Sequence, residues 1–507
     1  MQANKVLKIY PTDSVAVAIE PIVKGEVVEV AGKPLAVVTD VPAGHKVALA
    51  DLEPGTPVIK YGYPIGAAKE PIPAGSHVHA HNIRTLLAES AEYHYDEAAA
   101  KACVKAAEQR KEEWAGKAPT ILAYQRDDGR IGVRNELWIV PTVGCVNQIA
   151  DHLVEWARKE FASLPLDGIH VWNHPYGCSQ MGDDHEATRR ILADLVHHPN
   201  AGGVLVLGLG CENNTMASFK ELVGPVDPHR VKFLVAQEVE DEVEAGRTLL
   251  QELAETASKD VRTPVPMSKL VVGFKCGGSD GFSGITANAL VGRFCDALTA
   301  MGGTAILTEV PEMFGAEQML MNRCVNRDIY KQTVALINDF KQYFVKHEQV
   351  VYENPSPGNK AGGISTLEDK SLGCVQKGGQ APVEAVLGYG DRVSHAGLNL
   401  LSGPGNDIVS TTAQTAAGTH LILFTTGRGT PLGAPVPTVK VASNDMLAEK
   451  KTNWIDFNAG RLLHEDDALV TADFIKLIAD TASGVYHTKN EQNGYAEISL
   501  FKDGVIL

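Results

Sequence analysis

Four cysteines share a local pattern that suits metal chemistry. Cys145, Cys178 and Cys211 each follow a glycine at the end of an apolar run, as in VLVLGLGC, and successive members lie 33 residues apart. Cys276 ends the run VVGFKC another 65 residues along and precedes two glycines. Thiolates bind soft metals, but cysteine also packs tightly beside glycine. We interpret the four as candidate metal ligands, with a place beside a metal, a redox-sensitive pocket and simple packing as alternatives.

Histidines form a second candidate site. His77, His79 and His81 alternate in SHVHAHN, and alternate residues of a strand face the same side. This pattern predicts an array of three imidazoles that could bind a divalent metal, although a hydrated surface strand would look the same. His45 lies nearby in PAGHKVAL. His45 and His79 are the candidate acid–base residues.

Several polar residues could recognise an anionic, hydroxylated ligand. Asn82 and Arg84 follow the histidines directly. Arg134 belongs to RDDGRIGVRNE, where its fork could bind a carboxylate or the acidic neighbours. Lys360 in GNKAGGIS and Arg428 in TTGRGTPLG place a cation in a glycine-rich turn, which suits an anion. Neither turn matches a nucleotide-binding fingerprint. We therefore expect all five to bind substrate, and Lys360 and Arg428 to assist catalysis.

Acidic residues add weaker signals. Asp280 lies in CGGSDGFSG, whereas Glu309 and Glu312 lie in TEVPEMFGAE. Asp280 is a candidate substrate-binding residue, and the two glutamates are candidate acids or metal ligands.

The charge and composition of the chain exclude several classes of partner. A net charge of −16 argues against nucleic acid or an anionic membrane, both of which demand a basic surface. No apolar run approaches the ~18 residues of a membrane helix. The N-terminus lacks the apolar core of a secretory signal, which predicts a cytoplasmic protein. In a large chain without a signal, the eight cysteines are more typical of free thiols or metal ligands than of a disulfide framework. They form no CxxC pair, so a structural zinc ribbon is not expected.

The elements that must position these residues change along the chain. Residues 1–85 are short β-prone runs between PAG and EPG turns, which predicts a small β-rich domain. Residues 86–118 are rich in Ala, Glu and Lys and predict a helical connector. Residues 119–350 alternate apolar runs with helical segments, as in a parallel α/β sheet. Residues 351–507 are glycine-rich and predict a further C-terminal α/β domain.

The cysteine spacing fits this parallel sheet. One βαβ unit takes roughly 30 residues, so Cys145, Cys178, Cys211 and Cys276 should each follow a strand. The carboxyl ends of parallel strands share one edge, where open α/β folds bind ligands. The spacing therefore predicts that all four thiols lie on one rim of one sheet.

Several long motifs resemble those of the altronate/galactarate dehydratase family. They are GHK (44–46), YQRDDGRIGVRN (124–135), HPYGCSQ (174–180), GLGCEN (208–213), KCGGSDGFSG (275–284), NPSPGNKAGG (354–363) and FTTGRGTPLG (424–433). The resemblance runs from about residue 6 to about residue 460. It implies a small N-terminal SAF-type domain, a large dehydratase region, and metal-dependent hydro-lyase activity on a hexonate or hexarate. The implied metal is divalent, most often Fe²⁺, with Mn²⁺ as the other option.

Within the family, the HVHAHN run and the DSVAVAI opening resemble the altronate branch. This implies dehydration of altronate to 2-dehydro-3-deoxy-D-gluconate in hexuronate catabolism. The expected partner is a small anionic sugar acid. The SAF-type domain should dock over the sheet rim, either of its own subunit or of a neighbour, which leaves a homo-oligomer open.

Three other functions remain open at this stage. The chain could dehydrate galactarate or another aldonate or aldarate. It could be an iron–sulfur hydro-lyase, with three of the four cysteines holding the cluster. It could also be a sugar-acid-binding or regulatory protein that uses its SAF-type module for recognition.

Overall fold

Short antiparallel strands build the N-terminal part of the chain. The computed structural model describes residues 5–87, 93–351 and 354–504. One sheet has the order β1-β2-β5-β8, a second has the order β6-β7-β9, and β3 and β4 form a separate hairpin. Their bounds are Val6–Leu7, Val15–Ala18, Val27–Val30, Lys33–Ala36, Lys46–Ala48, Pro57–Lys60, Tyr63–Ala68, His77–Val78 and Ile83–Arg84 for β1 to β9. The predicted β-rich N-terminal domain is confirmed.

A helix, α1 (Glu97–Trp114), follows this domain. Asp96 caps its first turn by accepting a hydrogen bond from the backbone of Ala99. Only Ala100 and Ala107 of the helix are buried, and this side packs against α6 (Ala287–Ala300). Residues 88–92 of the expected connector lie outside the described residues.

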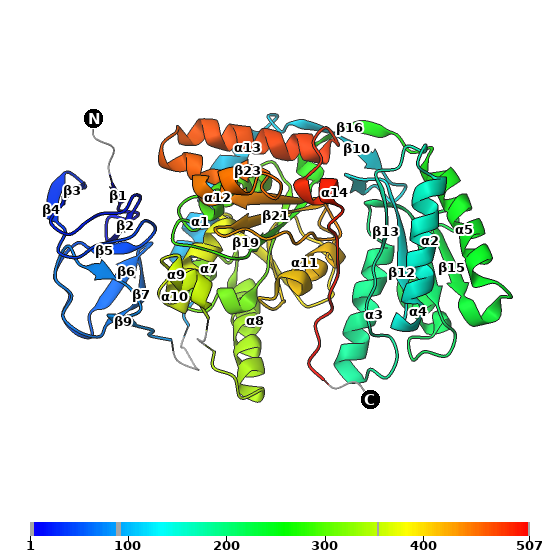
Figure 1. Ribbon diagram of the computed structural model, residues 1–507, viewed down its shortest axis with the longest axis horizontal. Coiled ribbons are helices and arrows are strands. Elements are labelled where there is room, and N and C mark those ends of the chain that lie inside the picture. The colour runs from blue at the N-terminus through cyan, green and yellow to red at the C-terminus, as the bar shows by residue number, and fades with distance from the viewer. Residues whose placement is uncertain (1–4, 88–92, 352–353, 505–507) are drawn as a thin grey trace.

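A four-stranded parallel sheet forms one end of the molecule (Figure 1). Its order is β13-β12-β14-β15, and successive residues of each strand face opposite layers of helices. Helices α2 and α5 cover one face, and α3 and α4 cover the other. The bounds are Glu136–Pro141 (β12), Gly168–Val171 (β13), Ala201–Gly208 (β14), Val231–Val235 (β15), Asn147–Glu160 (α2), Gly182–Val196 (α3), Met216–Val223 (α4) and Glu242–Ala257 (α5).

Two connections join this end to the rest of the chain. Strand β10 (Thr120–Gln125) enters the four-stranded region, and β16 (Arg262–Pro266) leaves it. The two strands pair antiparallel, with Tyr124 opposite Arg262, and β11 (Ile131–Gly132) completes a three-stranded sheet.

A seven-stranded parallel sheet occupies the middle of the molecule (Figure 1). Its order is β19-β20-β18-β17-β21-β22-β23. The strands are Val271–Cys276 (β17), Thr304–Leu307 (β18), Val383–Leu387 (β19), Gly397–Leu401 (β20), Leu421–Thr426 (β21), Thr438–Ala442 (β22) and Phe457–Asn458 (β23). Strands from both sides of residue 350 therefore share one sheet.

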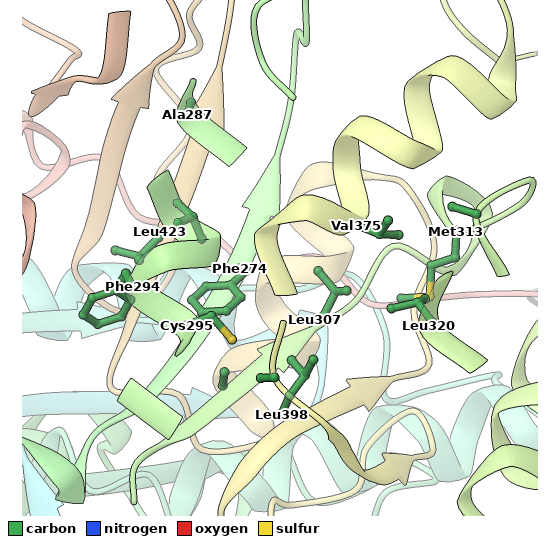
Figure 2. Close-up of a cluster of buried hydrophobic side chains, with 14 of the residues drawn as sticks. Phe274, Ala287, Phe294, Cys295, Leu307, Met313, Leu320, Val375, Leu398 and Leu423 are labelled. Carbon is green, nitrogen blue, oxygen red and sulfur yellow. The ribbon is translucent and has the colours of Figure 1, made fainter. Parts of the chain in front are cut away.

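Helices bury both faces of this sheet. Phe294 of α6 packs against Phe274 and Leu423 in the main core, which Figure 2 shows together with Leu307 and Leu398. Helix α11 covers the opposite face. The helices of this part are Glu317–Met321 (α7), Arg327–Lys346 (α8), Pro357–Ala361 (α9), Leu367–Cys374 (α10), Asp407–Ala416 (α11), Asp445–Lys450 (α12), Asp467–Ala482 (α13) and Lys489–Asn493 (α14). Among the described residues, no helix combines the length and apolar character needed to cross a membrane.

The overall α/β class is confirmed, but the prediction of one rim for four cysteines is wrong. Cys145, Cys178 and Cys211 follow β12, β13 and β14 of the four-stranded sheet. Cys276 ends β17 of the seven-stranded sheet. The 65 residues before Cys276 are not two further units of the first sheet, because they contain β15, α5 and the crossing strand β16.

We expect Leu307→Ala to destabilise the protein by ~2–5 kcal/mol, because Leu307 is 2% exposed and its loss leaves a cavity in the main core. The measurement is the midpoint of urea unfolding followed by circular dichroism. Leu469→Ala is the control, since Leu469 is 54% exposed and should change stability by less than ~0.5 kcal/mol. Equal midpoints for the two variants would contradict this account of the core.

Candidate functional site

Three histidines meet where two strands of the N-terminal domain pair. Strand β5 lies antiparallel to β8, with Val47 opposite His77, and the same register brings His45 toward His79. His45 Nδ1 lies 2.9 Å from His77 Nε2, and the rings of His45 and His79 are 4.9 Å apart. One nitrogen from each histidine lies within 4.8 Å of the others. This spacing allows all three to bind one metal ion.

The surroundings keep these imidazoles neutral. Burial lowers the pKa of His77 to about 3 and that of His79 to about 4, and it also lowers the pKa of His45. Neutral imidazole is the form that binds metals. His79 Nδ1 is buried and has no hydrogen-bond partner among the described residues. An unpaired buried nitrogen in this position fits a role as a metal ligand.

The strand that should carry three alternating histidines ends early. Strand β8 stops at Val78, and Asn82 holds the following turn by accepting from the backbone of His79 and donating to the carbonyl of His77. His81 is exposed, with its ring 5.3 Å from that of His77, and is outside the group of three. The predicted face of His77, His79 and His81 is therefore wrong in its third member, and His45 takes that place.

Glycines let the N-terminal domain approach the seven-stranded sheet. A Cβ atom on Gly281, in the loop after β17, would lie 1.9 Å from the carbonyl oxygen of Gly44. A Cβ on Gly363 would lie 2.4 Å from the same oxygen and 3.2 Å from the ring of His45. Gly44 itself has a φ of +78°, which favours glycine. The motifs GHK, GGSDGF and NKAGG thus meet beside the histidines.

A buried carboxylate, that of Asp369, fastens the N-terminal domain to the region of the seven-stranded sheet. Asp369 of α10 accepts from Lys46 at 2.8 Å and from Lys60 at 3.0 Å. Lys46 also donates to the carbonyl of Gly363 at 2.7 Å. Burial alone would raise the pKa of Asp369, but the two ammonium groups hold it well below its usual range. Both lysines come from strands of the N-terminal domain, so this ion pair orients it on α10.

A second group able to hold a metal lies inside the seven-stranded region. Cys276 and Cys374 have their sulfurs 3.4 Å apart, and a carboxylate oxygen of Glu312 lies 3.2 Å and 3.1 Å from the two. Lys377 Nζ is 2.8 Å from the Cys276 sulfur, and it also pairs with Glu309. These groups are buried. The ammonium of Lys377 already compensates negative charge here, which makes the histidine group the better cation site.

Comparisons with known proteins cover nearly the whole chain. Residues 4–86 match the model of the altronate/galactarate dehydratase SAF domain, and residues 123–258 match the second domain of D-galactarate dehydratase/altronate hydrolase. Residues 267–506 match the C-terminal domain of D-galactarate/altronate dehydratase. The altronate dehydratases of Bacillus subtilis and Escherichia coli are 52% and 51% identical to the chain, each over 99% of both sequences.

The chain belongs to the altronate/galactarate dehydratase family. Its full-length similarity makes it an enzyme of the hydro-lyase class. The galactarate dehydratase (L-threo-forming) of Escherichia coli is a more distant relative, 32% identical over 98% of this chain and 96% of its own length. The resemblance inferred from the sequence motifs is thereby confirmed.

Three of the cations expected to bind substrate are exposed in this family member. Arg428 is exposed in the loop after β21 and donates to the carbonyl of Gly358 at 3.3 Å. Lys360 is exposed on α9, and Arg84 is exposed on β9. No ion pair is formed by these three within the described ranges. They are available to an anion on the side of the sheet where the N-terminal domain docks.

Two other predicted substrate-binding residues have structural partners instead. Arg134 is fully buried and donates to Glu491 at 2.6 Å and to the carbonyl of Thr481. Asp280 accepts hydrogen bonds from Ser283, Ser443 and Asn444. Arg134 therefore anchors α14, and the Asp280 side chain shapes the loop after β17.

The sequence reasoning missed several residues of this region. Lys46, Lys60 and Asp369 were not singled out, because their charges pair across more than 300 positions of the chain. Cys374 was missed as well. One signal could have revealed it: like three of the four selected cysteines, it directly follows a glycine.

We expect Asp369→Asn to destabilise the protein by ~3–5 kcal/mol, because Lys46 and Lys60 would stay buried without their counter-charge. The measurement is the midpoint of thermal unfolding. Glu97→Gln is the matched control, since it removes a carboxylate from an exposed pair with Lys101 and should change little. If both variants unfold at the wild-type temperature, the ion pair does not fasten the N-terminal domain.

Proposed function

We propose that this protein dehydrates D-altronate to 2-dehydro-3-deoxy-D-gluconate, as a step of hexuronate catabolism, with a divalent metal ion at His45, His77 and His79. The observation that carries the proposal is the convergence of these three histidines, whose nitrogens lie within 4.8 Å of one another. Support for altronate over galactarate comes from identity, which is 51–52% to the two altronate dehydratases and 32% to the galactarate dehydratase. Fe²⁺ is the favoured ion and Mn²⁺ the second choice, both compatible with imidazole ligands.

The donor set fits a metal ion. Three neutral imidazoles offer converging nitrogens, and one of them, His79 Nδ1, has no protein partner among the described residues. Three histidines leave further coordination positions for a substrate, as in catalytic metal sites. When bound, such an ion would stabilise the negative charge that develops on the substrate carboxylate.

The protein side chains would bind the sugar acid and move protons. Arg428 and Lys360 would pair with the carboxylate and hydroxyl groups, because both are exposed beside the glycine-rich loops and form no ion pair with the residues that the structure describes. Dehydration removes the C2 proton and the C3 hydroxyl, which together leave as water. Where the ion is held by the other two histidines, His45 or His79 would accept the C2 proton as a free neutral imidazole, because a metal-bound imidazole has no lone pair left for it. The buried Lys46 beside them strengthens the preference for the neutral form.

The test is a substrate and metal screen on the purified protein. We expect turnover of D-altronate, loss of turnover after chelation, and recovery when Fe²⁺ is added, with detection of the 2-keto-3-deoxy product. Galactarate and other hexonates and hexarates are assayed in parallel. Preference for one of these acids would overturn the altronate assignment, and full activity of exhaustively demetallated enzyme would overturn the metal. Tight binding of sugar acids without turnover under every metal would favour a binding protein.

Single histidine variants distinguish a loss of catalysis from a loss of folding. His45→Ala and His79→Ala should each lower kcat by at least ~10²-fold, as expected for loss of a positioned catalytic group, and should lower bound metal. The far-ultraviolet circular dichroism should stay that of the wild type. His464→Ala is the control, because His464 is exposed and distant from the cluster in sequence. Near wild-type turnover in both cluster variants would exclude the N-terminal domain from the active site.

A further inference from the structure

Three exposed thiols lie on one edge of the four-stranded sheet. Cys145, Cys178 and Cys211 follow β12, β13 and β14, which are adjacent in the order β13-β12-β14. Cysteine is among the most buried residue types, and Cys276 and Cys374 follow that rule. The three on this edge are exposed instead. Packing beside glycine therefore does not account for them.

The loops that carry the thiols are fastened to one another. The backbone of Gly144 donates to the carbonyl of Tyr176 at 2.8 Å, which joins the Cys145 loop to the Cys178 loop. The backbone of Asn214 donates to the carbonyl of Gly177 at 3.2 Å, which joins the Cys211 loop to the Cys178 loop. The side chain of Asn213 accepts from the backbone of Ser179 at 2.9 Å. The three cysteines are thus parts of one connected surface.

Each cysteine follows a glycine because the loops approach closely at that point. A Cβ atom on Gly144 would lie 2.9 Å from the carbonyl oxygen of His174, and one on Gly177 would lie 2.1 Å from that of Thr142. A Cβ on Gly210 would lie 2.8 Å from the side-chain oxygen of Gln237. The glycines explain the tight assembly of the loops. The identity of the next residue, a thiol in all three cases, needs a separate reason.

A buried carboxylate makes this edge rigid. Glu212 is 3% exposed and accepts from the hydroxyl of Thr142 at 2.8 Å and from the backbone of Leu209 at 3.0 Å. Ser179, beside Cys178, has a left-handed φ of +56°, which a residue other than glycine adopts only when its surroundings impose it. The thiols are therefore held in place before any ligand binds.

We propose that Cys145, Cys178 and Cys211 hold an iron–sulfur cluster. The Cys145 and Cys211 loops are each hydrogen-bonded to the Cys178 loop, yet the three sulfurs do not all lie within 4.8 Å of one another. A single metal ion with sulfur ligands at about 2.3 Å needs the thiols closer together. In the described part of the chain, the cysteine and histidine groups close enough for one ion do not include these three. A cluster of several iron atoms spans wider thiolate sets.

The three thiols would bind the cluster by replacing ligands that it already carries. Each thiol loses one proton and forms one iron–sulfur bond, replacing a terminal ligand of the cluster. Three cysteines on a four-iron cluster leave one iron open to a further ligand. Gln237 Nε2 lies 3.6 Å from the sulfur of Cys211, and such hydrogen bonds to sulfur tune the reduction potential.

This centre is additional to the proposed altronate site. The four-stranded sheet and the N-terminal domain lie at opposite ends of the subunit, with the seven-stranded sheet between them (Figure 1). The histidine group and the cysteine group can therefore be loaded and tested separately.

The test measures iron and acid-labile sulfide per chain after anaerobic reconstitution with ferric salt, sulfide and dithiothreitol. The wild type should retain both and show the paramagnetic resonance of a reduced cluster after dithionite. Cys145→Ser, Cys178→Ser and Cys211→Ser should each lose most of the sulfide. Cys103→Ser is the matched control, because Cys103 lies on α1 outside the group, and it should retain the wild-type content.

The same assay distinguishes this inference from the proposed function. His79→Ala should keep its sulfide even when it loses turnover, since its position is in the other domain. Wild-type protein without acid-labile sulfide after reconstitution would overturn the inference. Iron without sulfide would also overturn it, in favour of a mononuclear site, and so would a triple serine variant with wild-type sulfide.

Discussion

The ion pair between Asp369 and two lysines is the interaction on which the arrangement of the altronate dehydratase-like site depends. Lys46 and Lys60 belong to different sheets of the N-terminal domain, and both donate to the same buried carboxylate on α10. Because His45 directly precedes Lys46, the position of that lysine fixes the position of the imidazole. A buried ion pair contributes little net stability but strongly disfavours arrangements that break it. Its main effect here is to select one docking geometry.

The glycine-rich motifs serve the same purpose by steric means. Gly281 and Gly363 approach the carbonyl of Gly44 too closely to admit a side chain, whereas Gly44 is favoured by its positive φ. The GNKAGG motif, which looked like an anion-binding turn in the sequence, is therefore also a docking surface. Asp280 shows the same dual character, since its carboxylate is occupied by hydroxyl and amide donors that shape the loop after β17.

Features encoded locally could be predicted from the sequence, whereas features that depend on distant pairing could not. Alternation of apolar runs with helical segments predicted the α/β region, and short runs between glycine turns predicted the β-rich domain. The histidine face failed at His81, because Asn82 forms a turn with the backbone around His79 and ends the strand. The role of Arg134 was misread since its partner, Glu491, lies 357 residues away. Equal spacing of three cysteines correctly reflected repeating units, but Cys276 followed a crossing to another sheet that the sequence pattern did not reveal.

The antiparallel pairing of β10 with β16 has a consequence for how the chain folds. Gln125 and Thr263 bond through their side chains although 138 positions separate them. A contact across such a length normally carries a large entropic cost of loop closure. The intervening residues contain a complete doubly covered sheet with its own apolar layers. Once that unit has folded, its two ends lie side by side, and the effective loop is short. Folding of the inserted unit thus lowers the entropic barrier for joining β10 to β16, and it brings α1, which precedes the unit, close to α6 of the central region that follows it.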